Sequence, residues 1–414
     1  MITWFYDCYS ILNKVYSDKA FFKQALSDTV IEESNRSLTT KTCYGVLERD
    51  GELSFYLKTL ADKSPKLAIR TILKISMYAI KYLDKHGYAV TKNAVELTKK
   101  LGKSGASGFV NAFLRKFINY NFTLPTNDID RLVIESSYPR FVVENITEKY
   151  GIERAKSILT APHADTCLSF YDYDGKTYLE NLGIEYSVTP FKNVFTCKNF
   201  VRNKDYDEGV YTYQALGSVA ICDIVAPCEK LLDCCSAPGG KSIRLSYKCK
   251  EITSWDIHEH RVGLIESYKK RMNRDNINPS VNDSKIYDEN YQNHFDSVLC
   301  DAPCSGLGVA GENPDIKINR TSESVDELTK EQLSILSNVS KYVKVGGYLY
   351  YSTCSIMDKE NDGVITTFLA NNPNYKVEKI DSLLVHQKTN HGIQFLPDIS
   401  GGNGFYIAKL KREN

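Results

Sequence analysis

The sequence lacks the features of membrane and secreted proteins. None of its apolar runs reaches the roughly 18 residues that a membrane-spanning helix needs. Its first ten residues carry Asp7 and no basic cluster, unlike a secretory signal. No Cys-x-x-Cys pair occurs among its twelve cysteines, which argues against a zinc site and against a disulfide framework. We therefore expect a cytoplasmic protein with reduced thiols, no bound metal and no membrane partner.

The chain also lacks a strong net charge, but its charges are unevenly distributed. The formal net charge of the 414 residues is +1. Residues 1–125 hold 19 lysines and arginines against 11 acidic residues, so the remainder is mildly acidic. Charge alone leaves two interpretations open for the first part: a merely soluble basic domain, or a domain that meets a polyanion such as nucleic acid.

Different hydrophobic patterns divide the chain into three expected domains. Over residues 1–125 apolar residues recur at helical spacing, which predicts an all-helical bundle. Residues 126–225 contain several prolines and short β-rich runs, so we expect a small α+β module. From residue 226 to 414 strands and helices alternate, which is typical of a doubly wound parallel sheet. The strands are expected at residues 230–234, 251–257, 297–300, 348–352 and 405–410.

The stretch 231–242, Leu-Leu-Asp-Cys-Cys-Ser-Ala-Pro-Gly-Gly-Lys-Ser, predicts a cofactor site. Its apolar residues favour a buried parallel strand, and Pro238, Gly239 and Gly240 must end that strand in a tight turn. A helix that starts near Lys241 would point main-chain N–H groups at a ligand. By itself the motif is as well explained by a strand-to-helix turn without a ligand, because short glycine motifs match by chance.

Two acidic residues are candidates for contacts to the same cofactor. Asp256 ends the second expected strand, about 20 residues after the glycine turn, where an acid holds ribose hydroxyls in doubly wound folds. Helix capping is the alternative role for Asp256. Asp283 follows a third, weaker apolar stretch and could accept a hydrogen bond from an adenine amino group, although a capping or turn role explains it nearly as well.

Two cysteines follow separate expected strands. The segment Asp301–Gly308 contains Cys304, and the segment Ser352–Ser355 contains Cys354. Each cysteine alone would more often be a small core residue. Two thiols at the carboxyl ends of separate strands, beside Asp301 and the glycine turn, form a candidate active site.

These groups match the needs of methyl transfer to C5 of cytosine. Cytosine C5 is a poor nucleophile, and a thiolate that adds to C6 makes it reactive towards a methyl donor. An acid at N3 offsets the charge that develops on the ring. The C5 proton must then leave before the thiol is eliminated, which requires a base or a second thiol. Asp301, Cys304 and Cys354 supply these parts.

Residues 226–412 resemble the NOL1/NOP2/Sun family of S-adenosylmethionine-dependent RNA cytosine-5 methyltransferases. The matching stretches are Asp233–Lys241, Asp256–Arg261, Asp301–Gly308, Asn313–Lys317, Ser352–Ser355 and Gly404–Leu410. The resemblance implies a Rossmann-like class I fold with Cys354 as nucleophile, Cys304 as the thiol that assists release and Asp301 against the cytosine. It implies cofactor contacts by Cys235, Ser236, Ala237, Pro238, Gly239, Gly240, Lys241, Asp256, Asp283 and Asp301. The chain departs from the family at Gly311-Glu312, where a basic pair is usual.

Residues 1–125 resemble the NusB-like RNA-binding fold, in the version fused to ribosomal RNA methyltransferases. The resemblance is carried by Tyr44–Leu47, Ala68–Leu83, His86–Leu97 and Gly108–Arg115. Together the two domains resemble bacterial enzymes of the RsmB type, which implies methylation of a cytosine in 16S ribosomal RNA. Nothing in the sequence indicates an obligate dimer, so we expect a monomer.

Three alternatives stay open. The substrate could be transfer RNA or another RNA. The chain could be a DNA cytosine methyltransferase, with Cys304 in its Pro-Cys dipeptide as the nucleophile. It could also be a non-catalytic RNA-binding scaffold. The second thiol, Cys354, and the basic helical domain favour RNA over DNA. The presence of Asp301, Cys304 and Cys354 together argues against a scaffold.

Overall fold

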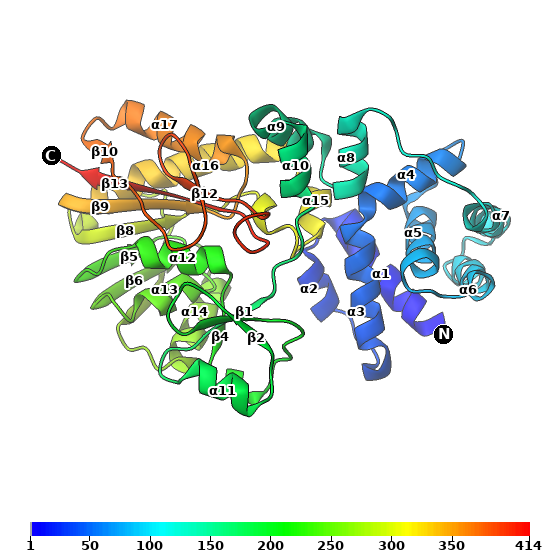
Figure 1. Cartoon of the computed structure of the whole chain (residues 1–414), viewed down its shortest axis with the longest axis horizontal. Coiled ribbons are helices and arrows are strands. Elements are labelled where there is room, and N and C mark those ends of the chain that lie inside the picture. The colour runs from blue at the N-terminus through cyan, green and yellow to red at the C-terminus, as the bar shows by residue number, and fades with distance from the viewer. Residues whose placement is uncertain (1) are drawn as a thin grey trace. The chain divides into compact units, whose positions relative to one another are not determined.

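The computed structural model describes residues 2–414, which form two compact units (Figure 1). Unit 1 comprises the chain up to Thr160 together with Ala310–Thr321. Unit 2 comprises Ala161–Val309 and Ser322–Asn414. No helix in the described part of the chain combines the length and hydropathy that a bilayer crossing requires.

Unit 1 is helical and packs around one central helix. Its helices are α1 (Ile2–Asp18), α2 (Phe22–Ser27), α3 (Glu33–Glu48), α4 (Asp50–Leu60), α5 (Leu67–Tyr82), α6 (Gly87–Lys100), α7 (Ser107–Ile118), α8 (Asp128–Ser136), α9 (Arg140–Tyr150), α10 (Ile152–Leu159) and the short α15 (Asp315–Asn319). Helix α5 is buried on nearly every side from Ile69 to Ala79, and a core of residues from α1 to α7 surrounds it. Most of the buried side chains of α5 are apolar, which explains the central place of this helix.

The expected α+β module is divided between the two units. Helices α8 to α10 belong to unit 1, and the strands that follow them belong to unit 2. Pro139 directly precedes α9, a position where proline's missing N–H group costs no helical hydrogen bond. The prolines of this region therefore mark helix starts as well as loops. The three-domain division of the chain stays a prediction.

A segment from the second half of the chain packs into unit 1. The Tyr44 hydroxyl on α3 donates a hydrogen bond to the Gly311 carbonyl oxygen. Lys317 Nζ donates to the Ser136 carbonyl oxygen at 2.9 Å and lies 4.5 Å from the ring centroid of Tyr138. Burial lowers the pKa of Lys317 to about 8. Gly311 and Lys317 of this segment are therefore occupied by contacts with the helices of unit 1.

Unit 2 is built on a large sheet whose middle is parallel. Its strand order is β11-β12-β13-β9-β8-β5-β6-β7, and β10 pairs with β13. The parallel strands are β5 (Lys230–Asp233), β6 (Glu251–Asp256), β7 (Ile277–Val281), β8 (Phe295–Asp301) and β9 (Val343–Thr353). The antiparallel ones are β10 (Tyr375–Val377), β11 (Gln387–Lys388), β12 (Ile393–Phe395) and β13 (Phe405–Arg412). The order of the parallel strands reverses between β5 and β8, which is where doubly wound sheets bind ligands.

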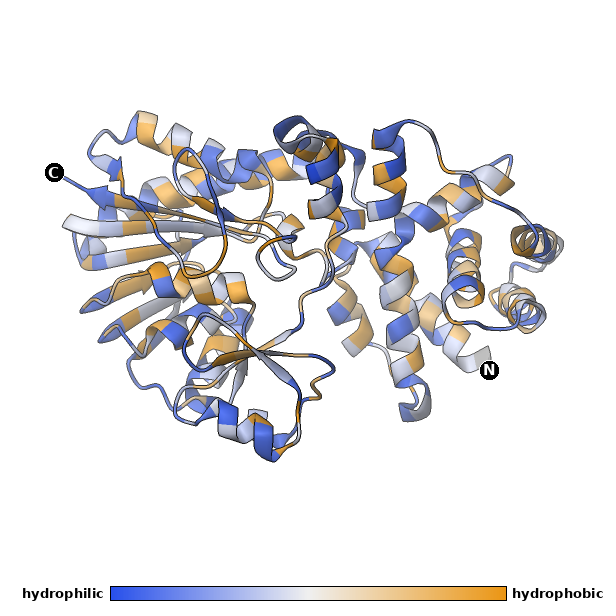
Figure 2. Cartoon of the chain, viewed as in Figure 1, coloured by the Kyte–Doolittle hydropathy of each residue, from blue (hydrophilic) through white to orange (hydrophobic). Residues whose placement is uncertain are grey.

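Both faces of the large sheet are buried. Leu231 and Tyr350 pack in one apolar cluster, and their neighbours Leu232 and Tyr351 pack in another. The covering helices are α12 (Leu216–Ile224), α13 (Gly240–Leu245), α14 (Glu259–Arg271), α16 (Ser322–Val339) and α17 (Asp362–Asn371). Figure 2 shows hydrophobic residues along the strands and on α12. Burial on both faces accounts for the continuous apolar runs of the parallel strands.

A small antiparallel sheet precedes the large one in unit 2. It contains β1 (Thr166–Ser169), β2 (Tyr186–Val188), β3 (Val194–Cys197) and β4 (Thr212–Tyr213) in the order β2-β3-β1-β4, with α11 (Gly175–Asn181). The β-rich runs near residues 167–171 and 194–200 indicated two of these strands.

Candidate active site

The glycine turn lies at the carboxyl end of β5, beside the point where the strand order reverses. Gly239 has φ of +104°, which favours glycine, and a Cβ atom there would lie 3.3 Å from the Ile265 side chain of α14. The N–H group of Ser236 donates to the Trp255 carbonyl oxygen at 2.8 Å. The turn is therefore fixed against both β6 and α14, and helix α13 begins directly after it.

Asp233 connects the strand before the glycine turn to the helix after it. It is completely buried, and it accepts a hydrogen bond of 2.6 Å from Ser242 Oγ on α13. Burial raises the pKa of the Asp233 carboxyl to about 7. This carboxyl therefore links the end of β5 to the start of α13 and has a structural place in the site.

Asp256 and Asp283 both lie at the same edge of the sheet as the turn. Asp256 is buried, accepts from the N–H group of His258 at 3.1 Å and lies 3.4 Å from Arg261. Arg261 also donates to the Ala237 carbonyl oxygen at 3.1 Å and so ties Asp256 to the turn. The half-buried Asp283 accepts from the N–H group of Lys285 at 2.9 Å, which is a turn contact. Both acids make local hydrogen bonds, and their role as cofactor contacts stays a prediction.

The segment that contains Asp283 is anchored to the glycine turn. The hydroxyl of Ser284 donates to the Cys234 carbonyl oxygen at 2.6 Å. Cys234 is buried in the core, whereas Cys235 is half-buried. A hydrogen bond with Cys234 and burial raise the pKa of the Cys235 thiol well above its usual value. Cys235 is therefore held protonated and is a poor nucleophile.

An ion pair joins the turn to the end of β8. Lys241 Nζ lies 2.7 Å from Asp301 Oδ2, and the Ser352 hydroxyl donates to Asp301 Oδ1 at 2.7 Å. Burial disfavours the ammonium form of Lys241, but the negative charge of Asp301 outweighs this and raises the lysine pKa. Both oxygens of Asp301 are thus held in a fixed orientation, and a charged lysine stands beside them.

The two predicted cysteines meet at the carboxyl ends of β8 and β9. Their sulfur atoms are 3.2 Å apart, and the N–H group of Cys354 donates to Cys304 Sγ at 3.3 Å. Both side chains are half-buried, and Ser305, Thr353 and Ser355 beside them are fully buried. The hydrogen bond with Cys354, together with burial, raises the pKa of the Cys304 thiol well above its usual value. The raised pKa favours the S–H form of Cys304, and the Lys241 charge interacts with Cys354.

Glycines allow the cysteine loops and the last strand to approach closely. The N–H group of Gly308 donates to the Cys354 carbonyl oxygen at 2.9 Å, and the N–H group of Gly404 donates to the Gly308 carbonyl oxygen at 2.7 Å. A Cβ atom on Gly308 would lie 2.2 Å from the Gly404 carbonyl oxygen. The matching stretches Asp301–Gly308, Ser352–Ser355 and Gly404–Leu410 therefore form one packed unit.

Sequence reasoning missed Glu360, a completely buried acid behind the two cysteines. Its carboxylate accepts hydrogen bonds from the hydroxyls of Ser305 and Ser355, each of which directly follows one cysteine. The repeated Cys-Ser dipeptide was the available signal, since two serines at the same offset can share one acceptor. Ser352 was likewise missed as a partner of Asp301.

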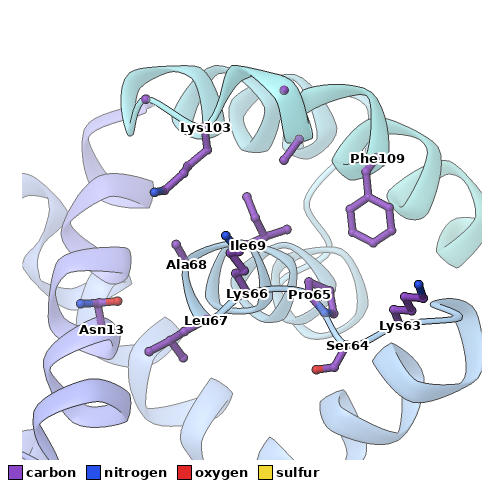
Figure 3. A pocket seen from close by; sticks show the side chains of 13 residues that line it. Asn13, Lys63, Ser64, Pro65, Lys66, Leu67, Ala68, Ile69, Lys103 and Phe109 are labelled. Atoms are coloured by element: carbon purple, nitrogen blue, oxygen red, sulfur yellow. The ribbon is translucent and has the colours of Figure 1, made fainter.

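Unit 1 contains a cavity of about 740 Å³ with a basic rim, which we call the basic cavity (Figure 3). Lys63, Lys66 and Lys103 line it, together with the ring of Phe109, which is 41% exposed. Figure 3 shows Phe109 and Lys103 on one side of the hollow and Pro65 and Lys66 on the other. None of the described residues that line it is acidic.

Comparisons with known proteins match both halves of the chain. A family model described as 16S rRNA methyltransferase RsmB/F matches residues 224–411, and the NusB family model matches residues 8–119. A probable ribosomal RNA small subunit methyltransferase B of Bacillus subtilis is 30% identical to the chain. The alignment covers 97% of this chain and 96% of that protein. Similarity over nearly the whole length of both proteins supports a shared domain order.

Solved structures show the same fold. PH0851 matches with a TM-score of 0.83 at 20% identity, covering 99% of this chain and 98% of that one. NSun6 from Pyrococcus horikoshii, solved with SFG, matches with a TM-score of 0.59 at 18% identity, covering 67% of this chain and 99% of that one. The expected fold class is confirmed: a NusB-like helical domain, a small α+β part and a Rossmann-like methyltransferase domain.

Proposed function

Because this chain belongs to the RsmB/F family of 16S ribosomal RNA methyltransferases, we propose that it methylates C5 of a cytosine in small-subunit ribosomal RNA. The observation that carries the proposal is the pair of thiols 3.2 Å apart, with the Lys241–Asp301 ion pair at the same sheet edge. One thiol would form a covalent bond to the base, and the second would assist its release.

The residues at the sheet edge fit S-adenosylmethionine, which supplies an electrophilic methyl group when bound. A Cβ atom on Gly240 would have no neighbour closer than 3.9 Å, so the backbone of the turn is open to a ligand. The buried oxygen of the Gln214 amide has no hydrogen-bond partner among the described residues, and the amide nitrogen lies 3.4 Å from the Gly240 carbonyl oxygen. We assign the turn Cys235–Lys241, with Asp256 and Asp283, to cofactor binding.

The first step forms the bond between Cys354 and the base. Cys354 Sγ attacks C6 as a thiolate, which the Lys241 ammonium stabilises. Electrons move into the ring, and a proton passes from Lys241 through Asp301 to N3, so that C5 becomes nucleophilic. The fixed orientation of Asp301, held by Lys241 and Ser352, serves this transfer.

The second step breaks that bond after methyl transfer. The C5 proton leaves to water, its bonding electrons form the C5=C6 double bond and expel Cys354 from C6 as a thiolate, and N3 returns its proton through Asp301 to Lys241. Cys304 Sγ lies 3.2 Å from Cys354 Sγ and its raised pKa favours the S–H form, so Cys304 can donate to the departing thiolate and stabilise it. The target nucleotide must leave its stack to reach these thiols, which favours an unpaired or extrudable cytosine.

Product analysis tests this proposal. The protein is incubated with methyl-labelled S-adenosylmethionine and an unmodified small-subunit RNA transcript, and the digested RNA is analysed by mass spectrometry. We expect 5-methylcytidine at one site. A parallel incubation contains unmodified transfer RNA, and label there but not on the ribosomal transcript would identify transfer RNA as the substrate. No label, together with no cofactor binding by calorimetry, would instead support the scaffold alternative.

We assign the basic cavity of unit 1 to RNA contact. Three lysines around an apolar hollow can meet phosphates, and an exposed phenylalanine ring offers a stacking surface for an unpaired base. None of the three ammonium groups has an acidic partner among the described residues of the chain. The positive balance of residues 1–125 agrees with this assignment.

We expect removal of these lysines to lower the affinity for RNA and to make that affinity less dependent on salt concentration. For the triple variant Lys63→Ala, Lys66→Ala, Lys103→Ala we expect the slope of log K against log salt to fall by about 2, since each lost phosphate contact removes about 0.7 on single strands. The measurement is a filter-binding titration with the unmodified transcript at several salt concentrations. The matched control replaces three exposed lysines outside the cavity, Lys41, Lys92 and Lys116. An equal loss in the control would show that only total charge matters.

A further inference from the structure

Glu360 connects the two cysteine loops through hydrogen bonds. Its Oε1 accepts from the N–H group of Ser305 at 2.7 Å and from Gln332 Nε2 at 3.1 Å. Its Oε2 accepts from the hydroxyl of Ser305 at 2.6 Å and from the hydroxyl of Ser355. The two hydroxyl oxygens are themselves 3.2 Å apart. We call these four residues, Glu360, Ser305, Ser355 and Gln332, the Glu360 network.

The network reaches both sides of the thiol pair. Ser305 follows Cys304 and Ser355 follows Cys354, so one carboxylate holds both loops directly after their cysteines. Gln332, on α16, also donates to the Pro303 carbonyl oxygen at 2.9 Å, which fixes the residue before Cys304. A shift of Glu360 would therefore change the position of both thiols.

The next residue, Asn361, completes the support of the Cys354 loop. Its side-chain oxygen accepts from the Thr353 hydroxyl at 2.6 Å, and its Nδ2 donates to the Ser355 carbonyl oxygen at 3.0 Å. The residues on both sides of Cys354 are thus fixed by Glu360 and Asn361. The cysteine between them has little freedom to move.

Glu360 holds two loops with a buried carboxylate, and burial of a carboxylate is unfavourable in free energy. Burial of an isolated carboxylate costs several kcal/mol or more of free energy. Hydrogen bonds offset this cost only when both carboxylate oxygens have enough donors. Four donors meet the two oxygens of Glu360, which matches the acceptor capacity of an ionised carboxylate. A neutral amide such as glutamine offers one acceptor oxygen in place of two, so it could not accept from all four donors. The charge of Glu360 therefore comes with the network, and it also acts on groups near the network.

The negative charge acts on Cys304. The hydrogen bond to Cys354 and burial are the main causes of the raised pKa of Cys304, and the charge of Glu360 raises this pKa further. The acid thus favours the S–H form of the thiol that faces Cys354. The positive charge of Lys241 acts on the other thiol of the pair, because it interacts with Cys354.

We propose that Glu360 is a positioning residue for the two-thiol chemistry: it fixes the separation of Cys304 and Cys354, and its charge favours the S–H form of Cys304. This inference rests on the proposed function, because it assigns Cys304 to release of the base. Glu360 touches neither base nor cofactor in this account. It acts through Ser305, Ser355 and its charge.

The test compares two buried acids of the same segment. Glu360→Gln removes the charge and keeps the size of the side chain. The matched control is Asp362→Asn, because Asp362 is also buried and accepts hydrogen bonds from Thr389, Asn390, His391 and Tyr406, none of which belongs to a cysteine loop. For each variant the readouts are kcat, the Kd of S-adenosylmethionine, the unfolding temperature and the pH dependence of Cys304 alkylation followed by mass spectrometry.

For Glu360→Gln we expect kcat to fall about 10- to 100-fold, the size of effect that a small misplacement of reacting groups produces. The cofactor Kd stays unchanged, and Cys304 becomes reactive towards iodoacetamide at lower pH than in the wild type. Asp362→Asn changes the unfolding temperature but not the alkylation profile. Equal alkylation profiles in Glu360→Gln and the wild type, or equal losses of kcat in the two variants, would overturn the inference. Failure of the wild type to form 5-methylcytidine would instead contradict the proposed function.

Discussion

Replacing Cys354 with alanine reduces methyl transfer to small-subunit RNA by about 10⁴-fold or more, the scale seen when an enzyme loses its nucleophile. The reason is chemical: without a sulfur at C6 the cytosine ring has no route to a nucleophilic C5. The rate is measured in single turnover with excess protein and labelled cofactor. Cofactor affinity stays at the wild-type value by calorimetry, because Cys354 lies at the end of β9, outside the Cys235–Lys241 turn.

A matched thiol control separates this result from a general effect of cysteine loss. Cys228 is also half-buried and belongs to unit 2, but it precedes β5 and so lies at the opposite end of that strand from the glycine turn. Cys228→Ala should methylate RNA at close to the wild-type rate. If Cys304→Ala, and not Cys354→Ala, removed all covalent chemistry, the nucleophile would be Cys304, as in the DNA methyltransferase alternative.

Replacing Asp301 with asparagine lowers kcat by about 10²- to 10⁴-fold, the range for loss of a positioned acid or base. Asparagine can still accept the hydrogen bond from Ser352 but leaves the buried ammonium of Lys241 without its partner at 2.7 Å. The proton path from Lys241 to N3 is then broken. Steady-state kinetics at saturating RNA and cofactor measure the effect.

The same strand supplies the control for Asp301. Asp296 lies near the start of β8, pairs with Lys344 and accepts from the N–H group of Lys230 at 2.9 Å. Asp296→Asn therefore also removes an ion pair from β8, but at the edge of the sheet away from the thiols. We expect a lower unfolding temperature and nearly unchanged kcat. A loss of kcat as large as that of Asp301→Asn would show that strand stability, and not proton transfer, explains the first result.

The residues of the candidate site could be grouped from the sequence because parallel strands bring their carboxyl ends to one edge of the sheet. Asp256, Asp301 and Cys354 each end or follow an apolar run, and the order of β5, β6, β8 and β9 places them together. The short length of β5 and the sharp turn at Gly239 were likewise visible as an apolar run followed by glycines. For these residues local pattern and topology were sufficient.

Contacts between distant segments could not be predicted in the same way. Glu360 is 55 positions from Ser305, and no local pattern connects them. The packing of Lys317 against Ser136 spans 181 positions, and it takes a lysine from the matching stretch Asn313–Lys317 into the helical unit. Strands β10, β11 and β12 were missed because segments of two or three residues are too short to show a period of two.

The measurement that tests the central claim most directly is a denaturing gel of Cys304→Ala protein incubated with S-adenosylmethionine and unmodified small-subunit RNA. Our account predicts a shifted protein–RNA band, because Cys354 bonds to C6 and the thiol 3.2 Å away that assists release is missing. The band disappears in the double variant Cys304→Ala, Cys354→Ala. No band with Cys304→Ala, together with full methylation by Cys354→Ala, would contradict the two-thiol account and place the nucleophile elsewhere.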